Sequence, residues 1–198
     1  MNSEKKRLYE PARVIAVCIL IGLLAAIYFV VGDGAAVRFG DNYETVWVQH
    51  DFYRLFTAIF MHADFHHLWN NCLSLLILGL AFTRKSKPIT FYFIFLAGGL
   101  IGNIGSVFYH GIMIHDTTTY SLGASGAVYA ILGALVIESF VMEHGSDRYG
   151  ALIYAFLALA ISLEQPHIDH AAHLCGLVAG LALEGVLLYI QTQRNLYD

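Results

Sequence analysis

The chain is 198 residues long, with 58% hydrophobic and only 13% charged residues, and its mean hydropathy is +0.61. Soluble domains carry roughly a quarter charged residues, so this composition argues against a soluble domain and favours a protein that lies in lipid. The net charge of −4 identifies no partner, and we expect no nucleic acid among the partners. The three cysteines, Cys18, Cys72 and Cys175, lie in apolar stretches. That placement favours packing residues over a disulfide framework.

Six apolar segments follow one another along the chain, at residues 14–31, 62–82, 88–108, 125–142, 150–163 and 172–190. Most approach the roughly 20 residues that a helix needs to cross a bilayer core, and in lipid such segments must be helices to satisfy their backbone. The fifth is short. We therefore expect an all-α polytopic membrane protein, with one domain over 1–198: a basic N-terminus at 1–13, a six-helix core at 14–190 and a tail at 191–198.

The basic residues fix the expected orientation of this bundle. Nine of the eleven fall on the side of the N-terminus, and only Arg38 and Arg54 fall on the other side. Lysine and arginine mark the cytoplasmic side of membrane proteins. We therefore expect both termini to be cytoplasmic, in a multi-pass protein of a cell membrane such as the bacterial inner membrane.

Three polar clusters lie at the outer ends of the second, fourth and sixth segments, at residues 62–71, 123–126 and 167–173. Within them, His67, Ser125 and His173 each lie 17 to 21 residues from a charged cytoplasmic position, which is about 25–31 Å of helix. Polar groups inside a membrane are costly and are commonly functional. Their shared depth predicts a single site built from three helices.

Ser125 has the features of a nucleophile. It stands in a Gly-x-Ser-Gly turn at a predicted helix N-terminus, where free amides and the helix dipole can stabilise an oxyanion. Gly123 and Gly126 leave room for a substrate backbone. His173 is the histidine most firmly inside a helix at matching depth, so we expect it to be the base.

Three further residues are predicted to support this pair. His67 and Asn71 are four residues apart and share a helix face, and both can donate hydrogen bonds to an oxyanion, together with Ser125. Tyr129, one turn after Ser125, is placed to stack under His173 and hold its ring. Gly176 and Gly180 lie on the same side of the sixth segment as His173, and their spacing favours close helix packing.

Structural explanations exist for the same residues. Small residues in Gly-x-Ser-Gly help membrane helices to pack, and a histidine and asparagine on one face can be interhelical hydrogen-bonding partners. The glycines of the third segment are assigned to close packing alone (Gly98, Gly99, Gly102 and Gly105). Glu138 and Glu184 lie near cytoplasmic helix ends, so we expect them to snorkel to water.

Taken together, these motifs resemble the rhomboid family of intramembrane serine proteases. The resemblance covers roughly residues 54–180 and rests on the order of its pieces: Arg54, His67-x-x-x-Asn71, Gly123-Ala-Ser125-Gly126, Tyr129, and Ala172-His173 with Gly176 and Gly180. Many relatives have Trp-Arg where this chain has Tyr53-Arg54.

The resemblance implies a six-helix bundle that cleaves transmembrane protein substrates and uses no cofactor or metal. Ser125 and His173 would form the dyad, and His67, Asn71 and the Ser125 amide the oxyanion hole. The aromatic-rich first outer loop and the fifth helix would lie in the membrane surface and gate substrate entry. The sequence leaves the substrate and the oligomeric state open.

A second hypothesis is a metal-binding membrane protein, either a transporter or a metal-dependent hydrolase. Ten histidines is a high count, and several of them lie on the outer side of the predicted bundle, among them His62, His66, His67, His167, His170 and His173. The spacing of the last three resembles that of metal ligands. However, there is no His-Glu-x-x-His motif, and His167 and His170 are expected in a solvated loop after Pro166.

Overall fold

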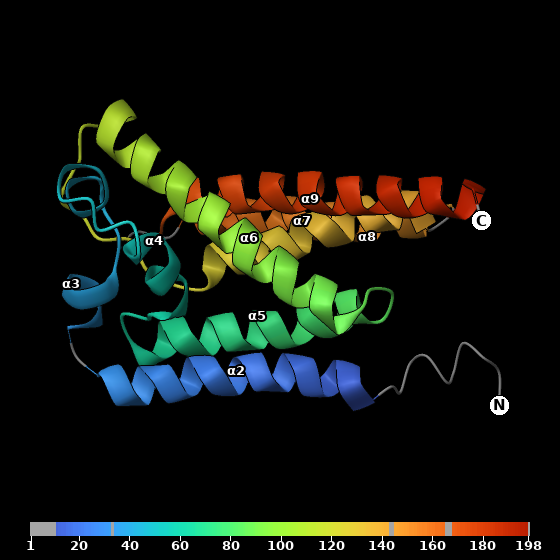
Figure 1. The fold of residues 1–198 in the computed structure, drawn as a ribbon, viewed down its shortest axis with the longest axis horizontal. Coiled ribbons are helices and arrows are strands. Elements are labelled where there is room, and N and C mark those ends of the chain that lie inside the picture. The colour runs from blue at the N-terminus through green and yellow to red at the C-terminus, as the bar shows by residue number, and fades with distance from the viewer. Residues whose placement is uncertain (1–10, 33, 143–144, 165–167, 198) are drawn as a thin grey trace.

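The computed structural model describes residues 11–32, 34–142, 145–164 and 168–197. These residues form helices and loops (Figure 1), in the order α2 (Pro11–Val31), α3 (Ala35–Phe39), η1 (Glu44–Val48), α4 (Arg54–Thr57), η2 (Ala58–Phe60), α5 (Phe65–Thr83), α6 (Pro88–Phe108), η3 (Tyr109–Met113), α7 (Ser125–Met142), η4 (Asp147–Tyr149), α8 (Gly150–Leu163) and α9 (His170–Tyr197). In this part of the chain, β pairing is confined to an isolated antiparallel bridge between Asp41 and Ser121.

Five of the described helices are long and apolar enough to cross a bilayer: α2, α5, α6 with η3, α7 and α9. The predicted segments at 88–108, 125–142 and 150–163 coincide with α6, α7 and α8. The third of these, α8, has only 14 residues and is shorter than a typical span. The expectation of a helical membrane protein is confirmed for the described residues.

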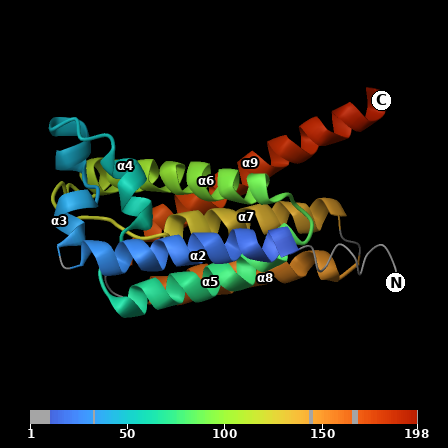
Figure 2. The same ribbon diagram turned by 60° about the horizontal axis from the view of Figure 1, so that its bottom comes forward.

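Helix α7 occupies the centre of the bundle, in contact with α5, α6, α8 and α9. In its apolar window 61% of the residues are buried, against 22% for the peripheral α2. The short helices α3 and α4 gather at the end of the bundle where α7 and α9 begin (Figures 1 and 2). The starts of the two central helices are therefore covered by the segment that joins α2 to α5.

Glycines bring α6, α7 and α9 together at backbone distance. A Cβ added to Gly176 would lie 2.1 Å from the carbonyl oxygen of Gly126, and one added to Gly180 would lie 1.8 Å from that of Ala130. On α6, a Cβ at Gly98 would lie 2.2 Å from the Ala130 Cβ. The close packing predicted for both sets of glycines is confirmed.

Three helix starts differ from the prediction, and the first of them is that of α2, which begins at Pro11 and not at 14. Helix α5 begins at Phe65 and not at 62, because the Asp64 side chain accepts a hydrogen bond from the His67 amide, 2.8 Å away, and caps the helix. Helix α9 begins at His170 and not at 172. The placement of His170 in a solvated loop was thus wrong, because this residue belongs to the first turn and is partly buried.

The expectation that Glu138 and Glu184 snorkel to water was also wrong. Their side chains are buried, with 0% and 2% exposed. Glu138 accepts a hydrogen bond from the Ser86 hydroxyl at 3.0 Å, which compensates part of the cost of its burial. Position along a helix gave the depth of these residues but not the face on which they lie.

Candidate active site

Ser125 is the first residue of α7, at the end of the bundle covered by α3 and α4. Because the helix begins there, the amides of its first turn have no acceptor within the helix. The approach to Ser125 is held by Gly123, whose amide donates to the Ala58 carbonyl at 2.9 Å. Gly123 has φ of +135°, a conformation that side chains disfavour. The local backbone thus presents a serine beside free amide donors.

The residue after Ser125 contacts the residue before His173. A Cβ at Gly126 would lie 3.4 Å from the carbonyl oxygen and 3.7 Å from the Cβ of Ala172. His173 itself is 5% exposed, and the Ser125 hydroxyl makes no hydrogen bond within the described part of the chain. The fold therefore brings the two helix starts together while leaving the serine hydroxyl unpaired.

Tyr129 stacks on His173. The ring centroids are 4.2 Å apart and the planes differ by 19°. The Tyr129 hydroxyl donates to the Ala158 carbonyl of α8 at 2.9 Å. Tyr129 thus contacts α9 through its ring face and α8 through its hydroxyl.

His67 and Asn71 of α5 lie beside Gly123. A Cβ at Gly123 would lie 2.7 Å from both Cε1 and Nε2 of His67 and 3.9 Å from the Asn71 Nδ2. Asn71 is 5% exposed, and its amide donates to the His67 carbonyl at 3.2 Å. Side chains of α5 therefore line the backbone that leads into Ser125, and only glycine leaves space for them at position 123.

His62 extends this polar group behind His67. The two rings make an edge-to-face contact, with centroids 5.1 Å apart. Burial, together with the neighbouring charge of a protonated His67, lowers the pKa of His62 to about 4, against smaller opposing effects of Phe60 and Asp64. His62 is therefore neutral at pH 7.

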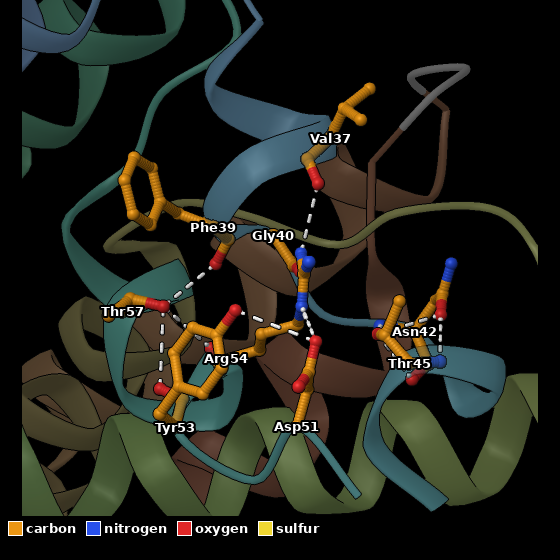
Figure 3. Close-up of polar contacts among 9 residues, drawn as sticks. All are labelled: Val37, Phe39, Gly40, Asn42, Thr45, Asp51, Tyr53, Arg54 and Thr57. Carbon is orange, nitrogen blue, oxygen red and sulfur yellow. Dashed lines mark hydrogen bonds and ion pairs between the residues drawn. The ribbon is translucent and has the colours of Figure 1, made fainter. Parts of the chain in front are cut away.

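Arg54 anchors the segment that covers the site (Figure 3). Its guanidinium donates to the carbonyls of Val37 and Gly40, both at 3.0 Å, and its Nε lies 3.0 Å from the Asp51 carboxylate. The Thr57 hydroxyl adds a bond to the Phe39 carbonyl at 2.9 Å. Arg54 thus holds the segment between α2 and α5 although Tyr53 stands where many relatives have tryptophan.

Asp169, at the start of α9, has a role that was not predicted from the sequence. Its carboxylate accepts hydrogen bonds from Ser106 and Ser121, and from the Ala172 amide at 2.9 Å. Burial raises the pKa of Asp169, but these bonds and that of His110 outweigh burial and hold the pKa below its ordinary value. An aspartate directly before an apolar helix is an N-cap signal that could have been recognised.

The structure does not assemble the histidines into a metal centre. No three His, Cys, Asp or Glu side chains within the described ranges are placed to hold one metal ion. His167 lies outside the described residues, and His66 points to an exposed contact with Asn70 on α5. The metal-binding hypothesis is not favoured.

Known proteins resemble this chain over the same region. The model of the rhomboid domain matches residues 49–190. RHOMBOID-like protein 1 of Arabidopsis thaliana is 31% identical over 154 residues, which are 76% of this chain and 38% of that protein. The rhomboid protein YdcA of Bacillus subtilis is 30% identical over 151 residues, 74% of this chain and 72% of that protein. Rhomboid protease GluP of the same bacterium is 29% identical over 150 residues, 73% of this chain and 28% of that protein.

The aligned part is thus well under half the length of two of these three relatives. The domain match nevertheless spans the first turn of α7, the polar start of α5 and the start of α9. It includes every residue proposed for the site from the sequence. This chain belongs to the rhomboid family.

Proposed function

We propose that this protein is an intramembrane serine endopeptidase that cleaves the transmembrane segments of other proteins with a Ser125–His173 dyad. The observation that carries the proposal is the contact between Gly126 and Ala172, the neighbours of the two residues. Relatives named as rhomboid proteases, such as GluP, support the same activity. The partners in this proposal are transmembrane substrates and the surrounding lipid.

The chemistry follows from the positions of the groups. His173 removes the proton of the Ser125 hydroxyl as its oxygen attacks the scissile carbonyl, and then returns that proton to the leaving amine. Water hydrolyses the resulting acyl-enzyme. The oxyanion of each tetrahedral intermediate accepts hydrogen bonds from the Ser125 amide, His67 and Asn71. Because these donors lie on α5 and α7, the oxyanion hole is formed between two helices.

The proposal includes the topology. The five long helices together with α8 cross the plasma membrane as a single six-helix domain, with both termini cytoplasmic. Nine of eleven basic residues then face the cytoplasm, in agreement with the charge bias of membrane proteins. The site lies toward the outer side, where α7 and α9 begin.

Substrate access is proposed to involve α8. Of its 14 residues only Ala155 and Ser162 are buried, so few contacts oppose its displacement. Its outer end precedes the start of α9 along the chain. Movement of α8 can admit a lipid-embedded helix without displacing the backbone contact between α7 and α9.

The test is cleavage of a model transmembrane substrate by purified protein in liposomes. Ser125→Ala and His173→Ala are each expected to abolish cleavage, and the double variant is expected to be little worse than either single one because the pair acts as a unit. Ser139→Ala is the matched control, since Ser139 is a buried serine of the same helix. Activity within tenfold of wild type in either dyad variant would refute the mechanism.

A second experiment, with a metal chelator, distinguishes the serine mechanism from the metal-dependent hydrolase. Phenanthroline is expected to leave cleavage unchanged, because a serine hydrolase has no metal-bound water to lose. Loss of activity that zinc restores would favour the metal-dependent hydrolase.

A further inference from the structure

The Asp169 carboxylate joins the start of α9 to α6, to η3 and to the loop before α7. One oxygen accepts hydrogen bonds from the hydroxyls of Ser106 on α6 and Ser121 in the loop before α7. The other accepts from the Ala172 amide at 2.9 Å and lies 3.6 Å from His110 Nε2 in η3. Its side chain is only 17% exposed. A carboxylate with this many donors is saturated and fixed in one orientation.

Asp169 and its partner Ser121 belong to the two segments that lead into the proposed dyad. Asp169 precedes His173 by four residues, and Ser121 precedes Ser125 by four residues. The Ser121 backbone is itself paired with Asp41, with N···O distances of 3.0 and 2.7 Å in the two directions. The Ser121–Asp169 hydrogen bond is therefore a direct link between the loop that ends at Ser125 and the helix start that bears His173.

The backbone of Asp169 reinforces this link. Its carbonyl accepts from the His173 amide at 3.2 Å, and its carboxylate caps the first turn through Ala172. These two local bonds fix the carboxylate to the first turn of α9. Rotation of that turn would therefore displace the carboxylate from Ser106 and Ser121, so the orientation of the turn is tied to α6 and to the loop before α7.

We propose that Asp169 is a positioning residue that sets His173 relative to Ser125 by binding the start of α9 to α6, η3 and the loop before α7. This inference rests on the proposed protease function. Asp169 touches neither Ser125 nor substrate in this scheme. It acts through the backbone of Ala172 and His173 and through Ser121, in place of a carboxylate bonded to the base itself.

The first test does not depend on activity. Hydrogen exchange of the micellar protein is compared for wild type, Asp169→Ala and Asp116→Ala. Asp116 is the matched control, since it also accepts three hydrogen bonds, from Thr118 and Thr119, but caps no spanning helix. Asp169→Ala is expected to accelerate exchange in the first turn of α9 and at Ser121, while α2 stays protected. Exchange at Ser121 equal to wild type would overturn the proposed link.

The second test is kinetic. A misplacement of about 1 Å in an active site can cost on the order of 10²-fold in rate. Asp169→Ala is therefore expected to lower kcat by about 10²-fold with KM within twofold, and Asp116→Ala to leave both unchanged. Asp169→Asn keeps an oxygen that can accept from the Ala172 amide, and it is expected to recover at least about tenfold of the loss.

The outcomes separate this inference from the proposed function. If Asp169→Ala has the kcat of the wild type and only a lower Tm, Asp169 acts as a helix cap alone. That result would overturn the positioning role. Cleavage that persists in Ser125→Ala would instead refute the serine mechanism. In that case the exchange experiment still decides whether Asp169 links α9 to the loop before α7.

Discussion

The imidazole of His173 lies nearly parallel to the phenol ring of Tyr129, with the ring centroids 4.2 Å apart. In soluble serine proteases a carboxylate holds the base through a hydrogen bond. Here the Nδ1 of His173 is buried with no hydrogen-bond partner in the described part of the chain, and an aromatic face supports the ring. The Tyr129 hydroxyl is bound to α8. The Tyr129 side chain therefore both supports the His173 ring and contacts α8.

The first prediction separates these two contacts of Tyr129. Tyr129→Phe keeps the ring face and loses the bond to Ala158, so we expect kcat within about threefold of wild type and a loss of about 1 kcal/mol in stability. Tyr129→Ala removes the stack as well, and we expect kcat to fall at least about tenfold beyond the phenylalanine variant. Equal kcat for both variants would show that the stack does not position His173.

The second prediction compares two neighbouring asparagines on α5. Asn71 is buried beside Gly123, and Asn71→Ala is expected to lower turnover by about 10²–10³ at most, since the other oxyanion donors remain. Asn70 is exposed and contacts only His66, so Asn70→Ala is the control and is expected to be silent. Unchanged turnover in Asn71→Ala together with a lower Tm would support a packing role.

The third prediction concerns the contact between α7 and α9. Gly180→Ala places a Cβ 1.8 Å from the Ala130 carbonyl oxygen, so the helices must separate and we expect a loss of about 1–3 kcal/mol. Gly22→Ala on α2 meets nothing within 4 Å, and we expect it to be neutral or to stabilise by up to about 1 kcal/mol through helix propensity. Equilibrium unfolding in micelles measures both. A Gly180→Ala variant as stable as Gly22→Ala would contradict the structure.

The fourth prediction follows from the pKa of His62, which is lowered to about 4. An unfolded histidine titrates near 6.5. Between those pH values the unfolded state binds a proton that the folded state does not, so stability falls as the pH decreases from about 6.5 to 4. The loss through this group reaches about 3 kcal/mol. It is absent above pH 6.5, where His62 is neutral in both states.

Two variants isolate this effect in unfolding experiments from pH 7 to pH 4. His62→Gln cannot titrate and is expected to flatten the pH dependence, although it lowers the stability at pH 7 through altered packing. His66→Gln on the exposed face of α5 is the control and is expected to retain the slope of the wild type. Identical slopes for His62→Gln and wild type would show that His62 does not carry the pH dependence.

Helix boundaries could be predicted where a helix-start residue coincided with the first residue of an apolar segment. Pro88 at the first turn of α6 marks a boundary that the structure reproduces. The start of α5 was misplaced because the count of apolar residues ran through His62. The helix in fact begins after Asp64, whose side chain is an N-cap signal that can be read from the sequence.

The residues of the candidate site could be predicted from the sequence, but the hydrogen bonds that link them to other helices could not. Depth along the helices grouped His67, Ser125 and His173, and glycine spacing predicted close packing of α9 against a neighbouring helix, which the structure identifies as α7. Tertiary hydrogen bonds could not be derived in this way, because Ser106, Ser121 and Asp169 are far apart in the chain. The burial of Glu138 and Glu184 was missed for a related reason, since depth in the membrane does not specify the neighbouring helix.

The enclosure of α7 has a consequence for biosynthesis. Helix α7 is surrounded by α5, α6, α8 and α9, and α9, which packs against Gly126 and Gly133 of α7, is translated after it. A ribosome-bound chain that has inserted α7 carries Ser125 but not the helix bearing His173. Under the proposed mechanism, hydrolytic competence therefore arises only after α9 enters the bundle, and the nascent protein does not attack neighbouring membrane proteins while it is being made. The order of synthesis would then serve the protective purpose that a pro-segment serves in secreted proteases.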